Sequence, residues 1–138
     1  MIAEYRELPM VIGSLRINNW QIKSEVLTVF NLGKGHINWL KSRLLYLFRR
    51  HEAVKVEMRN RGFKCDVLII DKVPAAVHYW NDWQPTLEDS IKIRNRLVEK
   101  IRFNKLPISW WRYKRVNLNL ESVEAFLDRI VNGELYYV

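Results

Sequence analysis

The spacing of hydrophobic positions along the chain predicts a protein built mainly from helices. In the first expected helix, Tyr5, Leu8, Ile12 and Leu15 recur at intervals of three and four residues and so form one apolar stripe. The same spacing continues in three later segments. The expected helices are 2–19, 36–61, 87–103 and a shorter one at 119–132. We therefore expect a mainly α fold, a compact bundle of three main helices plus a short C-terminal helix, forming a single domain over residues 1–138.

The longest expected helix, 36–61, carries its own apolar stripe and ends before Gly62, a residue suited to a helix C-terminus. The stripe comprises Ile37, Leu40, Leu44, Leu47, Phe48, Val54 and Met58. Thr86 and Asp89, three residues apart, are spaced as in a capping box at the start of the third helix. Two short segments rich in β-branched residues lie between the expected helices. Glu25–Phe30 predicts extended structure, and Val67–Ile70 predicts an extended or a buried segment.

Charge limits the classes of partner. The 138 residues contain 23 Lys and Arg against 15 Asp and Glu, a formal net charge of +8, with a pI near 9.8. An excess of this size on one domain favours a polyanion, and nucleic acid more than an anionic membrane surface. A basic surface that serves only solubility is the alternative. No apolar run has the length of a membrane span, so we expect no membrane partner.

Cysteine and histidine usage argues against a metal or a disulfide. The single Cys65 excludes an internal disulfide and is typical of a reducing cytoplasm. The three histidines, His36, His51 and His78, do not have the spacing of metal ligands. We expect no metal and no cofactor.

Two motifs in the first half of the chain are candidates for chemistry. Arg6 and Glu7 stand side by side two residues before Pro9, where the helix is expected to bend rather than end. A bend at that point brings both charges to one cleft, whereas a solvated helix start is the alternative interpretation. The turn Gly33-Lys34-Gly35-His36 places backbone N–H groups, Lys34 and His36 where a phosphate can bind, although it lacks the spacing of a P-loop.

Two further motifs are typical of DNA contact. Arg96 and Lys100 stand four residues apart and share one helix face, which suits successive phosphate oxygens as well as a plain exposed basic face. Farther on, aromatic and basic residues alternate, a pattern that suits base stacking and phosphate contact, or aromatic anchoring of the helices. That segment comprises Trp110, Trp111, Arg112, Tyr113 and Lys114.

Taken in order, these motifs resemble those of phage endonuclease V, the pyrimidine dimer DNA glycosylase of the T-even phages. The resemblance rests on Ala3-Glu-Tyr-Arg-Glu-Leu-Pro9, Leu32-Gly-Lys-Gly-His36 and Arg61-Gly62-Phe63. It resumes at Pro85 and covers most of residues 2–114. The resemblance implies an endonuclease V-like, mainly α-helical monomer that binds bent duplex DNA, extrudes a nucleotide and excises damaged or modified bases of the pyrimidine dimer type. It also implies the cytoplasm of an infected host cell, if the chain is phage-encoded.

The resemblance further implies a set of roles. In that family an N-terminal α-amino group attacks the sugar C1′ as the base leaves, and the resulting Schiff base permits β-elimination. An α-amine with a pKa of about 7.7–8.0 is a better nucleophile at neutral pH than a lysine of about 10.4. The catalytic glutamate of the family falls on Glu7 and its neighbouring arginine on Arg6. The basic residues that bind phosphate in that family fall on Arg96 and Lys100, and its lesion-recognising segment falls on residues 110–114.

Two departures alter the expected chemistry. Met10 stands where the family has a second arginine, and the family's segment that carries the nucleophilic amine precedes the position of Met1. We therefore expect a DNA N-glycosylase with altered or no AP-lyase activity. One alternative is a catalytically divergent DNA-binding protein of the same fold that acts on modified or host DNA. Another is an amine supplied by Met1, Lys34 or Lys114.

Overall fold

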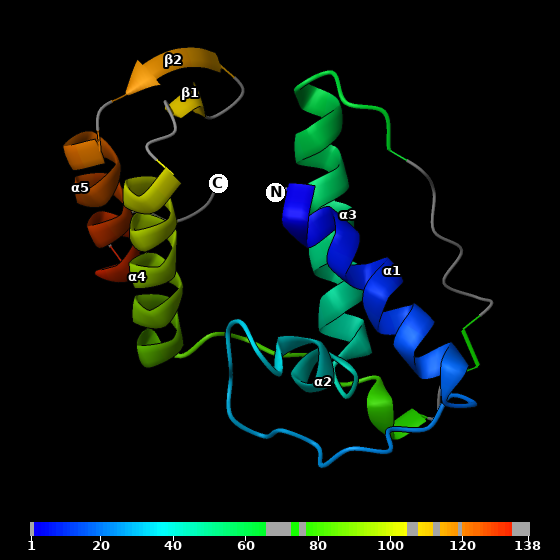
Figure 1. Ribbon diagram of the computed structural model, residues 1–138. Coiled ribbons are helices and arrows are strands. Elements are labelled where there is room, and N and C mark those ends of the chain that lie inside the picture. Colours follow the sequence, from blue (N-terminus) through cyan, green and yellow to red (C-terminus); the bar gives the residue numbers. More distant parts are fainter. Residues whose placement is uncertain are drawn as a thin grey trace. The chain divides into compact units, whose positions relative to one another are not determined.

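The computed structural model describes residues 2–65, 73–74, 77–104, 108–111, 114–118 and 120–133 (Figure 1). They belong to two units, residues 1–83 and 84–138, and each is described by itself. The prediction of a mainly α-helical fold is confirmed, whereas a single domain over the whole chain stays a prediction. None of the helices in the described ranges is long and apolar enough to cross a membrane.

The first unit contains α1 (Ile2–Ile17), α2 (His36–Leu40), α3 (Leu44–Asn60) and a short 3-10 helix (Val77–Tyr79). The second contains α4 (Leu87–Asn104), the strands β1 (Ile108–Trp111) and β2 (Lys114–Leu118), and α5 (Leu120–Val131). The bounds of α1, α4 and α5 agree with the predicted helices to within two residues at each end.

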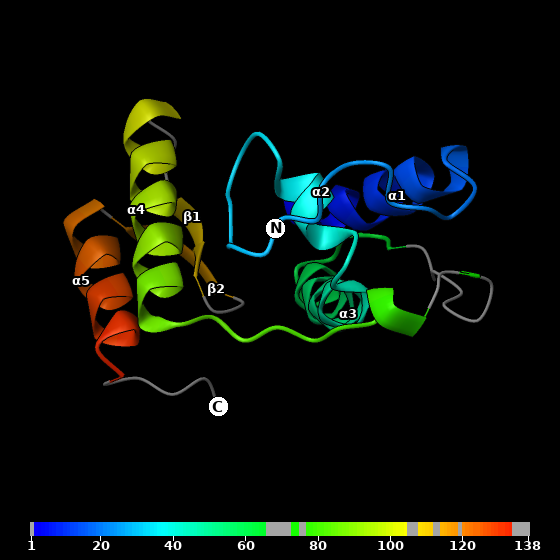
Figure 2. The same ribbon diagram turned by 90° about the horizontal axis from the view of Figure 1, so that it is seen from below.

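Helix α1 packs on α3 and also contacts α2, an arrangement that both views show (Figures 1 and 2). Its buried stripe consists of Leu8, Val11 and Leu15, none of which has any exposed surface. The predicted stripe named Ile12 in place of Val11. Ile12 is only half-buried, because the partner surface on α3 and α2, which periodicity alone does not locate, favours the neighbouring position.

Pro9 lies inside α1, and the helix continues through it, as the sequence predicted. Since proline has no N–H, the carbonyl of Tyr5, four residues earlier, loses its usual helical donor. The Nε2 of His51 on α3 donates to that carbonyl at 3.1 Å, and the His51 and Tyr5 rings stack with centroids 5.1 Å apart. Burial, together with the nearby Lys55 charge, lowers the pKa of His51, which keeps the ring neutral. A side chain of α3 therefore stabilises the proline position of α1.

The prediction of one long helix over 36–61 is wrong, because the chain leaves the helix at residues 41–43 and divides it into α2 and α3. Arg43 has φ −135° and ψ 48°, and its backbone pairs with that of Trp80. Its guanidinium donates to the carbonyls of Leu27, Thr28 and Trp39 at 3.1, 3.0 and 2.8 Å. These tertiary partners stabilise the break, which no glycine or proline marks in the sequence.

The turn before α2 is folded around Asn31. Its side-chain amide donates to the carbonyl of Lys34 at 2.7 Å, and its own carbonyl accepts from the Nδ1 of His36 at 2.6 Å. Gly35 has φ +97°, and a Cβ at that position would lie 2.9 Å from the Asn31 amide nitrogen. A glycine is therefore required there both for its backbone conformation and for the close approach of Asn31.

In the second unit, α4 begins with the predicted capping box. The backbone N–H of Thr86 donates to the Asp89 carboxylate and the N–H of Asp89 donates to the Thr86 hydroxyl, both at 3.2 Å. Helices α4 and α5 pack side by side through buried Val98 and Val123. The motif at Thr86 therefore marked the start of this helix correctly.

Ion pairs join α4 to α5. Arg94 binds Asp128 with two hydrogen bonds of 2.8 and 3.2 Å, and Arg102 donates to Glu124 at 2.6 Å. These contacts between charged side chains border the apolar seam and fix which turns of the two helices face each other.

The antiparallel hairpin of β1 and β2 was not predicted. Its register pairs Trp110 with Arg115 and Trp111 with Lys114, in a stretch whose aromatic and β-branched residues favour strands. Of the two segments that were expected to be extended, Glu25–Phe30 contains no strand, and Val67–Ile70 lies outside the described residues.

The Tyr5 carbonyl gives a test of the Pro9 contact. We expect His51→Leu to lower the free energy of unfolding by about 1–3 kcal/mol, because it leaves a buried carbonyl without a donor. In a Pro9→Ala background the N–H of residue 9 supplies that donor, so the same substitution should cost less. Urea denaturation followed by tryptophan fluorescence measures both, with the exposed His78→Leu as control. An equal cost in both backgrounds would show that the carbonyl is not the cause.

Two glycines give a matched pair for the turn. Gly35→Ala should lower the free energy of unfolding by about 1–3 kcal/mol, because a left-handed backbone and the Asn31 contact both oppose a Cβ. Gly13→Ala, in open space within α1, should raise it by about 0.5–1 kcal/mol. Thermal and urea unfolding of the two variants check the signs; a neutral Gly35→Ala would mean that the turn is not fixed by Asn31.

Candidate active site

Glu7 of α1 and His36, the first residue of α2, face each other in the first unit. The Nε2 of His36 lies 3.6 Å from the Oε2 of Glu7, a distance suited to attraction between charges but longer than a hydrogen bond. The side chains keep 15% of their surface exposed for His36 and 30% for Glu7. Two of the residues singled out in the sequence, 29 positions apart, therefore meet at one place.

Aromatic rings fix the orientation of the His36 ring. It stacks on Trp39 with centroids 5.6 Å apart and an interplanar angle of 12°, and Phe30 lies edge-on to it at 6.1 Å. Trp39 is completely buried and also contacts Tyr46 and Trp83. The imidazole is therefore attached to the aromatic core of the first unit.

The surroundings of His36 favour its protonated form. Burial lowers its pKa, but the Glu7 carboxylate and the Asn31 carbonyl, with the more distant Glu4 charge, outweigh burial and raise the pKa above its ordinary value. The pairing of His36 with Glu7 therefore contributes stability that is present below the ordinary pKa of histidine. That contribution is lost as the pH rises through the raised value.

A second carboxylate of α1, Glu4, lies one turn before Glu7. It accepts two hydrogen bonds from Arg50 of α3, at 3.0 and 2.9 Å. Burial raises the pKa of Glu4, but the charge of Arg50 and its hydrogen bonds lower that pKa by more than burial raises it, so the net shift is downward. Glu4 is therefore held as an anion that anchors the first turns of α1 to α3.

Tyr46 of α3 lies within the field of the same charges. Burial raises its pKa, Arg50 opposes that rise, and the charges of Glu4, Glu7 and Asp82 add to it. The phenol is therefore a neutral hydroxyl at physiological pH. Glu4, Tyr46 and Arg50 were not singled out in the sequence, although the spacing of three residues between Glu4 and Glu7 places both carboxylates on one helix face.

Arg6 and Lys34, the two predicted cations of the first unit, are exposed. Within the part of the chain that the structure describes, neither side chain has a hydrogen bond or ion pair, and Arg6 directly precedes Glu7. The helix that follows Lys34 has five residues, and the phosphate contact expected at this turn stays a prediction.

The remaining predicted residues belong to the second unit. Arg96 pairs with Glu99 at 2.8 Å and Lys100 is exposed on the same helix. Trp110, Trp111 and Lys114 lie in the hairpin, whereas Arg112 and Tyr113 lie outside the described residues. The roles of these residues in DNA contact stay predictions.

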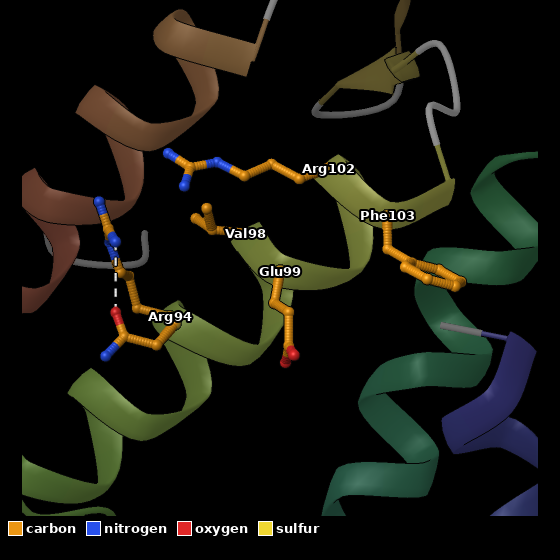
Figure 3. Close-up of a pocket in the computed structure, with 6 residues that line it drawn as sticks. Arg94, Val98, Glu99, Arg102 and Phe103 are labelled. Atoms are coloured by element: carbon orange, nitrogen blue, oxygen red, sulfur yellow. Dashed lines mark hydrogen bonds between the residues drawn. The ribbon is translucent and has the colours of Figure 1, made fainter.

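A depression of about 580 Å³ lies along α4 in the second unit (Figure 3). It is lined by Arg94, Asn95, Val98, Glu99, Arg102 and Phe103. The guanidinium of Arg94 donates to the side-chain oxygen of Asn95 at 3.2 Å, the bond drawn as a dashed line in Figure 3. It holds none of the predicted site residues, and we assign no chemistry to it. In the described ranges, no three His, Cys, Asp or Glu side chains are grouped as metal ligands.

A comparison with protein families gives the site its context. The sequence model of the family described as pyrimidine dimer DNA glycosylase matches residues 1–71 of the 138. The matched part contains Glu7 and its partner His36, Glu4 and its partner Arg50, and the turn before α2. Membership implies a function of the DNA glycosylase type with DNA as the substrate. The chain belongs to the pyrimidine dimer DNA glycosylase family.

Proposed function

We propose that this protein is an enzyme that binds duplex DNA, extrudes a nucleotide and excises damaged or modified bases of the pyrimidine dimer type, with Glu7 as its catalytic carboxylate. The observation that carries the proposal is the environment of Glu7. One oxygen faces His36, while Oε1 has no hydrogen-bond partner in the described part of the chain, and 30% of the side chain is exposed. A half-exposed carboxylate with one unengaged oxygen is suited to act on a substrate.

The chemistry of base excision explains the need for this group. The bond between C1′ and the base breaks with its electron pair on the base, and positive charge develops on the sugar. A nearby carboxylate stabilises that charge. If water adds to C1′, its proton passes to Glu7. If an amine adds instead, it loses a proton to Glu7, the C1′–O4′ bond of the sugar ring breaks as O4′ takes that proton, and the resulting Schiff base permits strand cleavage by β-elimination.

Exposed cations supply the contacts to DNA. Arg6 is the cation nearest to Glu7 in the chain, and we assign to it a phosphate of the extruded nucleotide. Lys34 provides a second charge in the first unit. In the second unit, Arg96 and Lys100 on α4 provide phosphate contacts and the tryptophan-containing hairpin provides surfaces for stacking.

The departure at Met10 favours a second candidate function. Met10 is 58% exposed on α1, at a position where the resemblance places an arginine, so a charge is replaced by an apolar surface near Glu7. This replacement is consistent with a protein that still binds DNA but no longer catalyses the reaction. Such a protein would bind modified or host DNA without releasing a base.

Substitution of the carboxylate tests the proposal. We expect Glu7→Gln to reduce base release by about 10²–10⁴-fold, because an amide carries no charge to stabilise the sugar cation and accepts no proton. The measurement is single-turnover cleavage of the C1′–base bond in an ultraviolet-irradiated duplex oligonucleotide. Abasic sites are revealed by alkali.

The matched control is Glu25→Gln, the same chemical change at an exposed site, which should leave the rate unchanged. Borohydride trapping on the same DNA distinguishes an amine nucleophile, which gives a covalent adduct, from water. If the wild-type protein binds the DNA and releases no base, the second candidate function holds. Equal rates for Glu7→Gln and the wild type would exclude Glu7 as the catalytic group.

A further inference from the structure

We propose that His36 is the positioning residue of Glu7: its imidazolium holds one carboxylate oxygen and thereby directs the other toward the DNA sugar. This inference rests on the proposed function of Glu7. It assigns to His36 a role in the reaction rather than the phosphate contact that the sequence suggested.

The first argument is the assignment of the two ring nitrogens. The Nδ1 of His36 lies 2.6 Å from the Asn31 carbonyl, and because a carbonyl only accepts, Nδ1 carries a proton. Asn31 is itself held by the bond from its side chain to the Lys34 carbonyl. Nε2 is therefore the ring nitrogen left to interact with Glu7.

The second argument is that the ring cannot turn away. The stack on the fully buried Trp39 and the edge contact with Phe30 fix the imidazole plane. With both the plane and the Nδ1 bond fixed, Nε2 has one direction, toward the Oε2 of Glu7 at 3.6 Å. A carboxylate attracted at Oε2 presents Oε1 in a defined orientation, which is the property a catalytic carboxylate requires.

The third argument is the effect of protonation. When His36 is an imidazolium, an N–H points at the carboxylate. When His36 is neutral, Nδ1 still keeps its proton, so a lone pair of Nε2 faces the lone pairs of Oε2 and the contact becomes repulsive. The charged and titratable groups around this pair are Glu4 on α1, Lys34 in the turn, Arg43 over the Trp39 ring, Tyr46 and Arg50 on α3, and Asp82. Of the groups around His36, Glu7, the Asn31 carbonyl and Glu4 outweigh burial and raise its pKa, which extends the pH range in which Glu7 is held.

The inference predicts a loss of activity on the alkaline side. As the pH rises through the raised pKa of His36, kcat for base release should fall, while KM changes little because His36 acts on Glu7 and not on the DNA. His36→Phe keeps the stack on Trp39 but has no donor, so we expect kcat to fall by about 10- to 100-fold across the pH range. His36→Gln keeps an uncharged donor and should restore part of kcat without the alkaline decline. His78→Gln, at an exposed position, is the matched control.

A second measurement does not depend on activity. Titration of the His36 ring resonances by nuclear magnetic resonance should give a lower pKa in Glu7→Gln than in the wild type. An unchanged His36 pKa would overturn the inference whatever the activity, as would an alkaline decline that persists in His36→Gln. A lowered pKa in a protein that releases no base would instead reject the proposed function and, with it, the role of His36 in the reaction.

Discussion

Pro9 has no backbone N–H, so α1 lacks one hydrogen-bond donor. The packing of α1 in the first unit depends on the side chain that takes the place of this donor. His51 of α3 donates to the Tyr5 carbonyl that Pro9 leaves without its helical partner. This bond joins the two helices at the point where α1 presents Glu4 and Glu7. Because burial keeps His51 neutral, the bond adds no further positive charge beside Glu4 and Glu7. A hydrogen bond from an uncharged side chain therefore helps to set the position of α1.

The two carboxylates of α1 differ in what holds them. Glu4 is bound by Arg50 through two hydrogen bonds and is committed to joining α1 to α3. Glu7 faces an imidazole at a longer distance and keeps one oxygen unengaged among the described residues. A carboxylate used in a reaction has to exchange partners, whereas one used for attachment does not. Their environments therefore differ within a single helical turn: Glu4 is committed to attachment, whereas Glu7 is available for the chemistry that we propose for it.

Local signals in the sequence identified several elements correctly. The capping box of Thr86 and Asp89 formed as expected, since both of its hydrogen bonds lie within four consecutive residues. The break between α2 and α3 was missed because it depends on Arg43 reaching carbonyls 15 and 16 residues earlier in the chain. The hairpin was missed because aromatic and basic residues were interpreted as a binding surface, whereas the same residues also favour strands.

The sequence by itself determined the helical character of the chain and its basic charge, and it singled out Glu7 as the candidate catalytic residue, because periodicity, composition and a short motif are properties of neighbouring residues. It also named His36, but as a contact for phosphate. Only the tertiary structure decided that His36 faces Glu7, since that depends on the turn around Asn31 and on the buried ring of Trp39. The pairing of residues on α1 and α2 depends on long-range packing, which spacing along the chain does not contain.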